Sequence, residues 1–297
     1  MTTNLRQDYL DPAVLQELGT MQLRARQLAE GVIAGLHRSP HRGGSVEFSE
    51  YTEYSHGHEL RHVDWKVFAK SDKYYVKQFE DETNLQAYLL VDGSGSMAYQ
   101  STNAPLSKLQ YATYLSATLA YLMIRQGDAV GAMGFADTAG TFLPAAARTR
   151  HLDDIFYLLD NLEGSGTTSL DPALRLIAER ARRRSLVMVF SDFLDAREST
   201  FELLRVLRSR KFDVALFHIL DPAELELPFE GLSLFEGLEG EGELLVDPDD
   251  LRQRYLEAIR LHCETLRSEA EKSNITYLRT LTSTPLEAIC QDFLRRR

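Results

Sequence analysis

The chain has 297 residues, 44% of them hydrophobic and 26% charged, which is the composition of an ordinary globular protein. Its formal net charge of −11 argues against a general attraction to nucleic acid or to anionic membranes, so neither is an expected partner. With no signal peptide and no apolar run of about 18 residues, we expect a cytoplasmic protein without membrane insertion. The two cysteines, Cys263 and Cys290, are too few for a disulfide framework and are expected to be buried thiols.

The N-terminal part of the chain is predicted to hold one helix and a β segment. Residues 11–38 have the pattern of a helix, because Asp11 can cap it, Pro12 suits its first turn and leucines recur on one face. Residues 45–82 are rich in Tyr, Phe, Val and Glu, which indicates short strands and turns.

The rest of the chain alternates short apolar runs with amphipathic segments. The apolar runs predict core strands over 87–91, 130–135, 186–190 and 214–219, an edge strand over 141–143 that Pro144 stops, and a last strand over 276–281. The amphipathic segments predict helices over 106–126, 148–162, 171–183, 198–209, 248–271 and 285–296. This alternation is typical of an α/β fold with a doubly wound, mostly parallel sheet.

Three parts of the chain follow from these patterns. They are an N-terminal helix (1–42), a β segment packed on the main domain (43–83), and an α/β domain with a hairpin excursion near 229–246 (84–297).

The most informative motif follows the first predicted core strand. Asp92, Ser94 and Ser96 alternate with two glycines, and alternation in an extended turn points the three side chains the same way. One carboxylate and two hydroxyls are hard oxygen ligands, which suit magnesium, calcium or manganese rather than zinc.

Two further loops have oxygen side chains at the same predicted edge of the sheet. Thr167 stands just before a helix, and Asp192 follows the apolar run 186–190. Each also has a simpler interpretation, because aspartate, serine and threonine are common turn and helix-capping residues.

In this order, Asp92-x-Ser94-x-Ser96, Gly166-Thr167 and Ser191-Asp192 resemble the metal-ion-dependent adhesion site of von Willebrand factor A domains. The resemblance implies that Ser94, Ser96 and Thr167 ligate the ion through hydroxyls, and that Asp92 and Asp192 act at least partly through bound water. It also implies an open coordination position that accepts a carboxylate from a partner protein.

A second resemblance lies upstream. Gly57-x-x-x-Arg61-His-Val-Asp64-Trp65 is similar to the signature of a bacterial family known as domain of unknown function 58, whose members carry a von Willebrand factor A-like domain. Members of that family tend to have arginine in place of Thr52 and aspartate in place of His58. We expect Arg61, Asp64 and Trp65 to hold this segment on the main domain by an ion pair and a buried ring, and a partner-binding role for the signature residues is the alternative.

These resemblances imply a function in protein binding. We expect a metal-dependent interaction module, with Mg²⁺ and alternatively Mn²⁺ or Ca²⁺, that serves as an adaptor or chaperone-like partner of a MoxR-type AAA+ ATPase. The chain lacks a P-loop, a dinucleotide-binding fingerprint and a nucleophile elbow, so we do not expect an enzyme. Two alternatives stay open: a metal-independent scaffold and a metal-dependent hydrolase.

Overall fold

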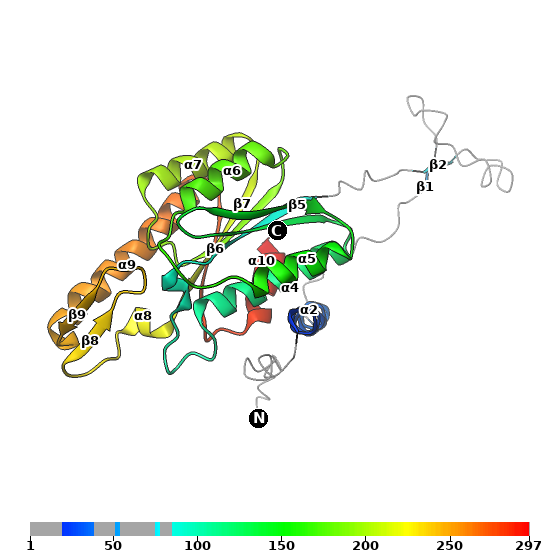
Figure 1. Ribbon diagram of the computed structural model, residues 1–297. Coiled ribbons are helices and arrows are strands. Elements are labelled where there is room, and N and C mark those ends of the chain that lie inside the picture. Colours follow the sequence, from blue (N-terminus) through cyan, green and yellow to red (C-terminus); the bar gives the residue numbers. More distant parts are fainter. Residues whose placement is uncertain (1–19, 39–50, 54–74, 78–84, 297) are drawn as a thin grey trace. The chain divides into compact units, whose positions relative to one another are not determined.

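The computed structural model describes residues 20–38, 51–53, 75–77 and 85–296 (Figure 1). Residues 39–84 form a unit separate from the rest of the chain, and the two units are described one at a time. In the larger unit, the described elements form a sheet with helices on both of its faces (Figure 1).

The sheet of this unit has six strands. They are β3 (Gln86–Asp92), β4 (Ala129–Phe135), β5 (Ala139–Ala146), β6 (Leu186–Ser191), β7 (Asp213–Leu220) and β10 (Thr276–Leu281). Their order is β10-β7-β6-β3-β4-β5, and all neighbours are parallel except the β4–β5 pair. The predicted α/β fold with a doubly wound, mostly parallel sheet is therefore confirmed, including its four core strands.

Side chains of the central strands alternate between two buried layers. In β3, Leu89 and Val91 belong to one buried cluster, whereas Tyr88 and Leu90 belong to the other. A strand buried on both faces is apolar at every position, which is why the sequence shows a continuous run.

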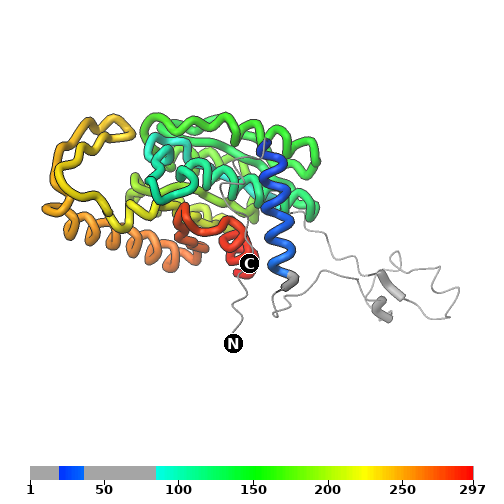
Figure 2. Tube along the Cα trace, turned by 90° about the horizontal axis from the view of Figure 1, so that it is seen from below, coloured from blue at the N-terminus to red at the C-terminus, as the bar shows by residue number. Residues whose placement is uncertain are grey.

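The helices divide between these two layers. One face is covered by α4 (Lys108–Arg125), α5 (His151–Asp160) and α10 (Leu286–Arg296), with α2 (Met21–Arg38) packed against α4 and α10 (Figure 2). The other face is covered by α6 (Leu170–Arg180), α7 (Glu198–Ser209) and the C-terminal half of α9 (Pro248–Lys272). Cys263 and Cys290 are free and buried, as predicted.

Some predicted boundaries were wrong, among them those at Pro144 and at residue 183. Pro144 lies within β5 rather than ending it, because β5 is an edge strand whose unpaired side tolerates a residue without an N–H group. The helix predicted to reach residue 183 ends at Arg180, and the chain then turns into β6.

Four short elements complete the described part of the larger unit. A 3-10 helix, η2 (Gly95–Ala98), follows β3 directly, and α8 (Pro222–Glu226) follows β7. Strands β8 (Ser233–Glu236) and β9 (Glu243–Val246) pair antiparallel, within the region 229–246 where the sequence indicated a hairpin.

In the smaller unit, β1 (Tyr51–Glu53) pairs antiparallel with β2 (Tyr75–Lys77). The signature residues Gly57, Arg61, Asp64 and Trp65 lie outside the described residues, as do positions 11–19 of the predicted first helix. The predicted packing of this segment on the main domain also lies outside them. Among the helices that the structure describes, none is long and apolar enough to cross a membrane.

The position of α2 in the core leads to a test of stability. Leu28 is fully buried in the core of the larger unit, whereas Leu23 on the same helix is 47% exposed. We expect Leu28→Ala to lower the free energy of unfolding by about 2–5 kcal/mol, because it leaves a cavity. Leu23→Ala serves as the matched control and should cost less than about 1 kcal/mol. Urea denaturation measures both, and equal effects would mean that α2 is not part of the cooperative core.

Candidate functional site

The candidate site lies where two neighbouring parallel strands end. Asp92 is the last residue of β3, and Asp192 directly follows β6. Because these strands are adjacent and parallel, their carboxyl ends meet at one edge of the sheet. The chain continues from β3 to one side and from β6 to the other, and such a switch point is where open α/β sheets form their binding crevice.

Backbone hydrogen bonds join the loops at this edge. The Gly93 N–H donates to the carbonyl of Phe135 at 2.7 Å, and the Gly95 N–H donates to the carbonyl of Gly166 at 2.9 Å. The Ser165 N–H donates to the Gly93 carbonyl at 3.0 Å. The loop after β3 is therefore fixed to the end of β4 and to the loop before α6.

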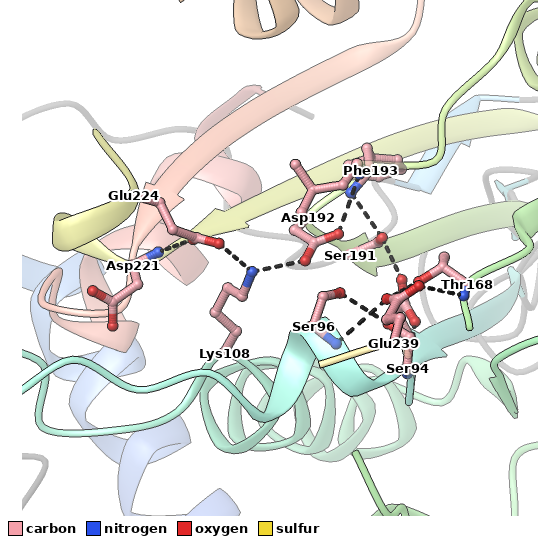
Figure 3. A network of polar contacts seen from close by, with 12 residues as sticks. Ser94, Ser96, Lys108, Thr168, Ser191, Asp192, Phe193, Asp221, Glu224 and Glu239 are labelled. Carbon is pink, nitrogen blue, oxygen red and sulfur yellow. Dashed lines mark hydrogen bonds and ion pairs between the residues drawn. The ribbon is translucent and has the colours of Figure 1, made fainter. Parts of the chain in front are cut away.

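Four of the five predicted ligands converge within this frame (Figure 3). The Ser94 N–H donates to Asp92 Oδ1 at 3.0 Å, and the Ser94 and Ser96 hydroxyl oxygens are 3.1 Å apart. The Ser191 hydroxyl donates to Asp92 Oδ2 at 2.6 Å. Ser96 also hydrogen-bonds Asp192, so the two carboxylates and the two serine hydroxyls form one cluster.

The fifth predicted ligand, Thr167, lies in the adjoining loop with an exposed side chain. Its neighbour Thr168 is half-buried and is held by both its N–H and its hydroxyl. The ligand role of Thr167 stays a prediction.

A buried lysine closes one side of the cluster. Lys108, the first residue of α4, is fully buried, and its Nζ lies 2.7 Å from Asp192 Oδ2 and 2.5 Å from Glu224 Oε1 (Figure 3). Burial alone disfavours its charge, but the two carboxylates outweigh burial and raise its pKa. The ammonium therefore joins α4, the end of β6 and α8 through two charge-assisted hydrogen bonds.

The two aspartates of the cluster have opposite electrostatic situations. Burial opposes the charge of Asp192, yet the Lys108 ammonium lowers its pKa below the ordinary value. For Asp92, burial and the charge of Asp192 raise the pKa to about 7, against the hydrogen bonds from Ser191 and Ser94. Lys108 thus stabilises Asp192, while Asp92 has no comparable cation among its described partners.

On the opposite side of Ser96 from Lys108 lies a carboxylate of the β8–β9 hairpin (Figure 3). Glu239 Oε2 accepts the Thr168 N–H at 3.0 Å, and Oε1 accepts the Thr168 hydroxyl at 2.9 Å and the Ser96 N–H at 3.4 Å. A side chain at Gly95 would place its Cβ 2.0 Å from the carbonyl oxygen of Leu238. Glycine at position 95 is therefore what lets the hairpin backbone approach the loop.

Sequence reasoning missed Lys108, Glu224, Thr168 and Glu239. Lys108 follows a serine that caps α4, and in the sequence it is an ordinary lysine in the first turn of a helix. Glu239 lies 143 residues from Ser96 along the chain. One signal was available, since a lysine in the first turn opposes the helix dipole and needs a local reason.

The donor set fits a hard divalent cation. In the described part of the chain, no group of three or more histidine, cysteine, aspartate or glutamate side chains could hold a metal ion, so a cation at this edge depends on the serine hydroxyls. Asp192 and Glu224 share the Lys108 ammonium, whereas Asp92 lies beside Asp192 with no cationic partner among the described residues. Buried carboxylates need compensation, and a divalent ion held by carboxylate, hydroxyl and water oxygens would supply it.

A groove adjoins this cluster. It has a volume of about 460 Å³ and is lined in part by Gly93, Phe135, Tyr157, Leu162 and Ser165. Tyr157 is 73% exposed, so the site has an accessible apolar neighbour on the side of β4 and α5.

Comparison with protein families identifies one match. The model of the family described as "Protein of unknown function DUF58" matches residues 50–265. That range includes the Gly57–Trp65 signature, all five predicted ligands and Glu239. The resemblance to this family, drawn from the upstream signature, is thereby confirmed.

Individual proteins are similar at lower identity. The uncharacterized protein Rv1480 of Mycobacterium tuberculosis is 27% identical over 265 residues, which cover 87% of this chain and 81% of that protein. Among solved structures, the conserved hypothetical protein BatB from Bacteroides thetaiotaomicron has a TM-score of 0.48 and 16% identity, covering 71% of this chain and 98% of that one. The VWA domain of SpRpn10 has a TM-score of 0.40 and 13% identity, covering 72% and 95%.

The buried lysine leads to the next prediction. Lys108→Met keeps the length of the side chain but leaves the buried Asp192 and the partly buried Glu224 without their counter-ion. We expect the free energy of unfolding to fall by about 3–5 kcal/mol, measured by chemical denaturation. Lys272→Met, which removes an exposed lysine of α9, is the control and should leave stability nearly unchanged. A small effect of Lys108→Met would show that the two ion pairs are solvated.

The raised pKa of Asp92 predicts a pH dependence of stability in chelator. The folded protein holds a proton on Asp92 up to a pH of about 7, whereas the unfolded chain loses it near the ordinary value of 3.8. The folded state therefore binds more protons between these values, so the contribution of Asp92 is fully present below about pH 4 and is lost as the pH rises through about 7.

Asp92→Asn removes this titration and keeps the side-chain shape. Relative to Asp92→Asn, the wild type should become less stable as the pH rises from 4 to 7. Above pH 7 the difference in unfolding free energy should stay constant. Denaturation series at several pH values give this difference, and a constant difference would contradict the shifted pKa.

Proposed function

Since this chain belongs to the DUF58 family and its oxygen side chains converge at one sheet edge, we propose that it is a non-enzymatic module that binds another protein through a divalent cation. The observation that carries the proposal is the burial of the Asp92 carboxyl group beside Asp192. The hydrogen bonds that Asp92 accepts do not offset the cost of burying its charge. A carboxylate in this position, next to two hydroxyls, favours a bound cation.

The proposed ligands follow the sequence motif. Ser94, Ser96 and Thr167 offer hydroxyls, and Asp92 and Asp192 act at least partly through bound water. Lys108 supports this division, because its ammonium takes Asp192 Oδ2 and leaves that carboxylate less free to bind an ion directly. Magnesium fits such a set best, since it keeps several waters, and manganese or calcium are alternatives.

This set of ligands also explains why we propose a partner with an acidic side chain. When bound among neutral hydroxyls, the ion keeps much of its positive charge and attracts an incoming carboxylate. The acidic chain, with its net charge of −11, repels an acidic partner elsewhere. Attraction is therefore confined to this edge, and the groove beside Tyr157 can hold residues next to the partner's acid.

The wider system is proposed from the family resemblance. The chain has no P-loop or other nucleotide-binding motif, so ATP-driven work in that system depends on another protein. We propose that a MoxR-type AAA+ ATPase supplies it and that this chain acts as its adaptor or chaperone-like partner. The isolated chain should then hydrolyse no ATP.

One observation favours a second candidate, a metal-independent scaffold. The Lys108 ammonium already neutralises part of the carboxylate cluster from within the fold. In this alternative, Lys108 replaces a metal ion, and the loops at the sheet edge serve only to fix the fold.

Metal titration separates the two candidates. Isothermal titration calorimetry with Mg²⁺ or Mn²⁺ should show one site in the wild type, and Asp92→Ala should weaken binding by more than about tenfold while the protein stays folded. Asp137→Ala is the matched control, because Asp137 is an exposed aspartate at the carboxyl end of β4 outside the cluster. No binding by the wild type would favour the scaffold.

Partner capture tests the binding function. Tagged wild-type protein in Mg²⁺ should retain partners that are lost in chelator and in Asp92→Ala, and mass spectrometry identifies them. A MoxR-type ATPase among the retained proteins would support the adaptor role. Identical capture with and without chelator would reject binding through the metal.

A further inference from the structure

The tip of the β8–β9 hairpin, residues 237–242, already places a carboxylate at the candidate site. Both oxygens of Glu239 are held by donors that belong to the two ligand loops: the Ser96 N–H, the Thr168 N–H and the Thr168 hydroxyl. We call these three donors the carboxylate cradle. The cradle adjoins the serine hydroxyls, since Ser96 contributes to both (Figure 3).

The fit of the hairpin to the loop is close. The Leu238 carbonyl lies against Gly95, where any Cβ would be only 2.0 Å from its oxygen. The Glu239 N–H is in turn held by Glu241 Oε2 at 3.0 Å, which orients the tip. A turn and the glutamate that it carries therefore match the shape of this edge.

The hairpin has little else to hold it. Its two strands have four residues each, and a two-stranded hairpin is marginally stable in isolation. Leu234, Leu244 and Leu245 are each more than half exposed. The three buried clusters of the described residues contain no residue of 233–246.

We infer that Glu239 is an internal ligand that occupies the position of the partner's acidic side chain, so that the partner must displace the hairpin to bind. The inference rests on the proposed function, because that function supplies the incoming carboxylate. The Glu239 carboxylate and the partner's carboxylate compete for the same three donors, and two negative charges in one site repel each other. The partner segment is then an acidic turn similar to residues 237–242, whose glutamate takes the cradle beside the proposed ion and whose backbone lies against Gly95.

This competition reduces the affinity that a partner experiences. A site that is open for only a fraction of the time binds with its intrinsic affinity multiplied by that fraction. Removing the internal carboxylate removes the competition without changing the cradle itself.

The experiment uses a fluorescent peptide of residues 233–246 as the probe, in Mg²⁺, with fluorescence anisotropy as the readout. We expect Glu239→Ala protein to bind this peptide at least about tenfold more tightly than wild type does. Glu243→Ala is the matched control, because Glu243 is an exposed glutamate of the same hairpin, and it should behave like wild type. A peptide with glutamine in place of Glu239 should not bind.

Two further measurements test the mechanism. Adding Thr168→Val to Glu239→Ala should abolish peptide binding, because it removes the hydroxyl donor of the cradle. Hydrogen exchange of residues 237–242 should be faster in Glu239→Ala than in wild type, while exchange in β3 and β6 stays unchanged and shows that the fold is intact.

Equal peptide affinity of wild type and Glu239→Ala, whether both bind or neither does, would overturn the inference. Tighter binding by Glu239→Ala that is the same in Mg²⁺ and in chelator would support the internal ligand and reject the metal. The two proposals therefore fail in distinguishable ways.

Discussion

The geometry of the sheet edge depends on the two ion pairs of the Lys108 ammonium. This ammonium is fully buried at the start of α4 and bonds both Asp192, after β6, and Glu224, on α8. Glu224 also accepts the Asp221 N–H at 2.7 Å, and Asp221 caps α8. Three separate parts of the chain are thus positioned around one charge, and Asp192 is oriented before any ligand arrives.

This arrangement divides the work of the two aspartates. Asp192 is ionised and fixed by Lys108, whereas burial and the neighbouring charge of Asp192 work against the ionised form of Asp92. A bound cation stabilises a site with one paired and one unpaired carboxylate more than a site in which both carboxylates are already paired. The unpaired carboxylate is also the one that anchors the loop, through the Ser94 N–H and the Ser191 hydroxyl.

The sequence predicted those parts of the structure that depend on local patterns. The strands β3 and β6 were found because burial on both faces makes every position apolar, and the positions of Asp92 and Asp192 followed from where those runs end. Lys108 and Glu239 were not found, because their roles arise from partners 84 and 143 residues away in the chain. Nothing in the local pattern separates Glu239 from the other glutamates of residues 236–243, since only the approach of Leu238 to Gly95 selects it.

The separation of the β8–β9 hairpin from the buried clusters has a consequence for how such a chain can change over time. Because residues 233–246 contribute to none of those clusters, substitutions in the hairpin alter its hold on the site with little effect on the folding of the sheet. Core residues are constrained by packing, whereas in the hairpin only the tip is constrained, by the approach of Leu238 to Gly95 and by the contacts of Glu239. If the hairpin competes with a partner as we infer, exchanging this segment of fewer than about twenty residues would change the affinity for the partner without changing the sheet edge itself.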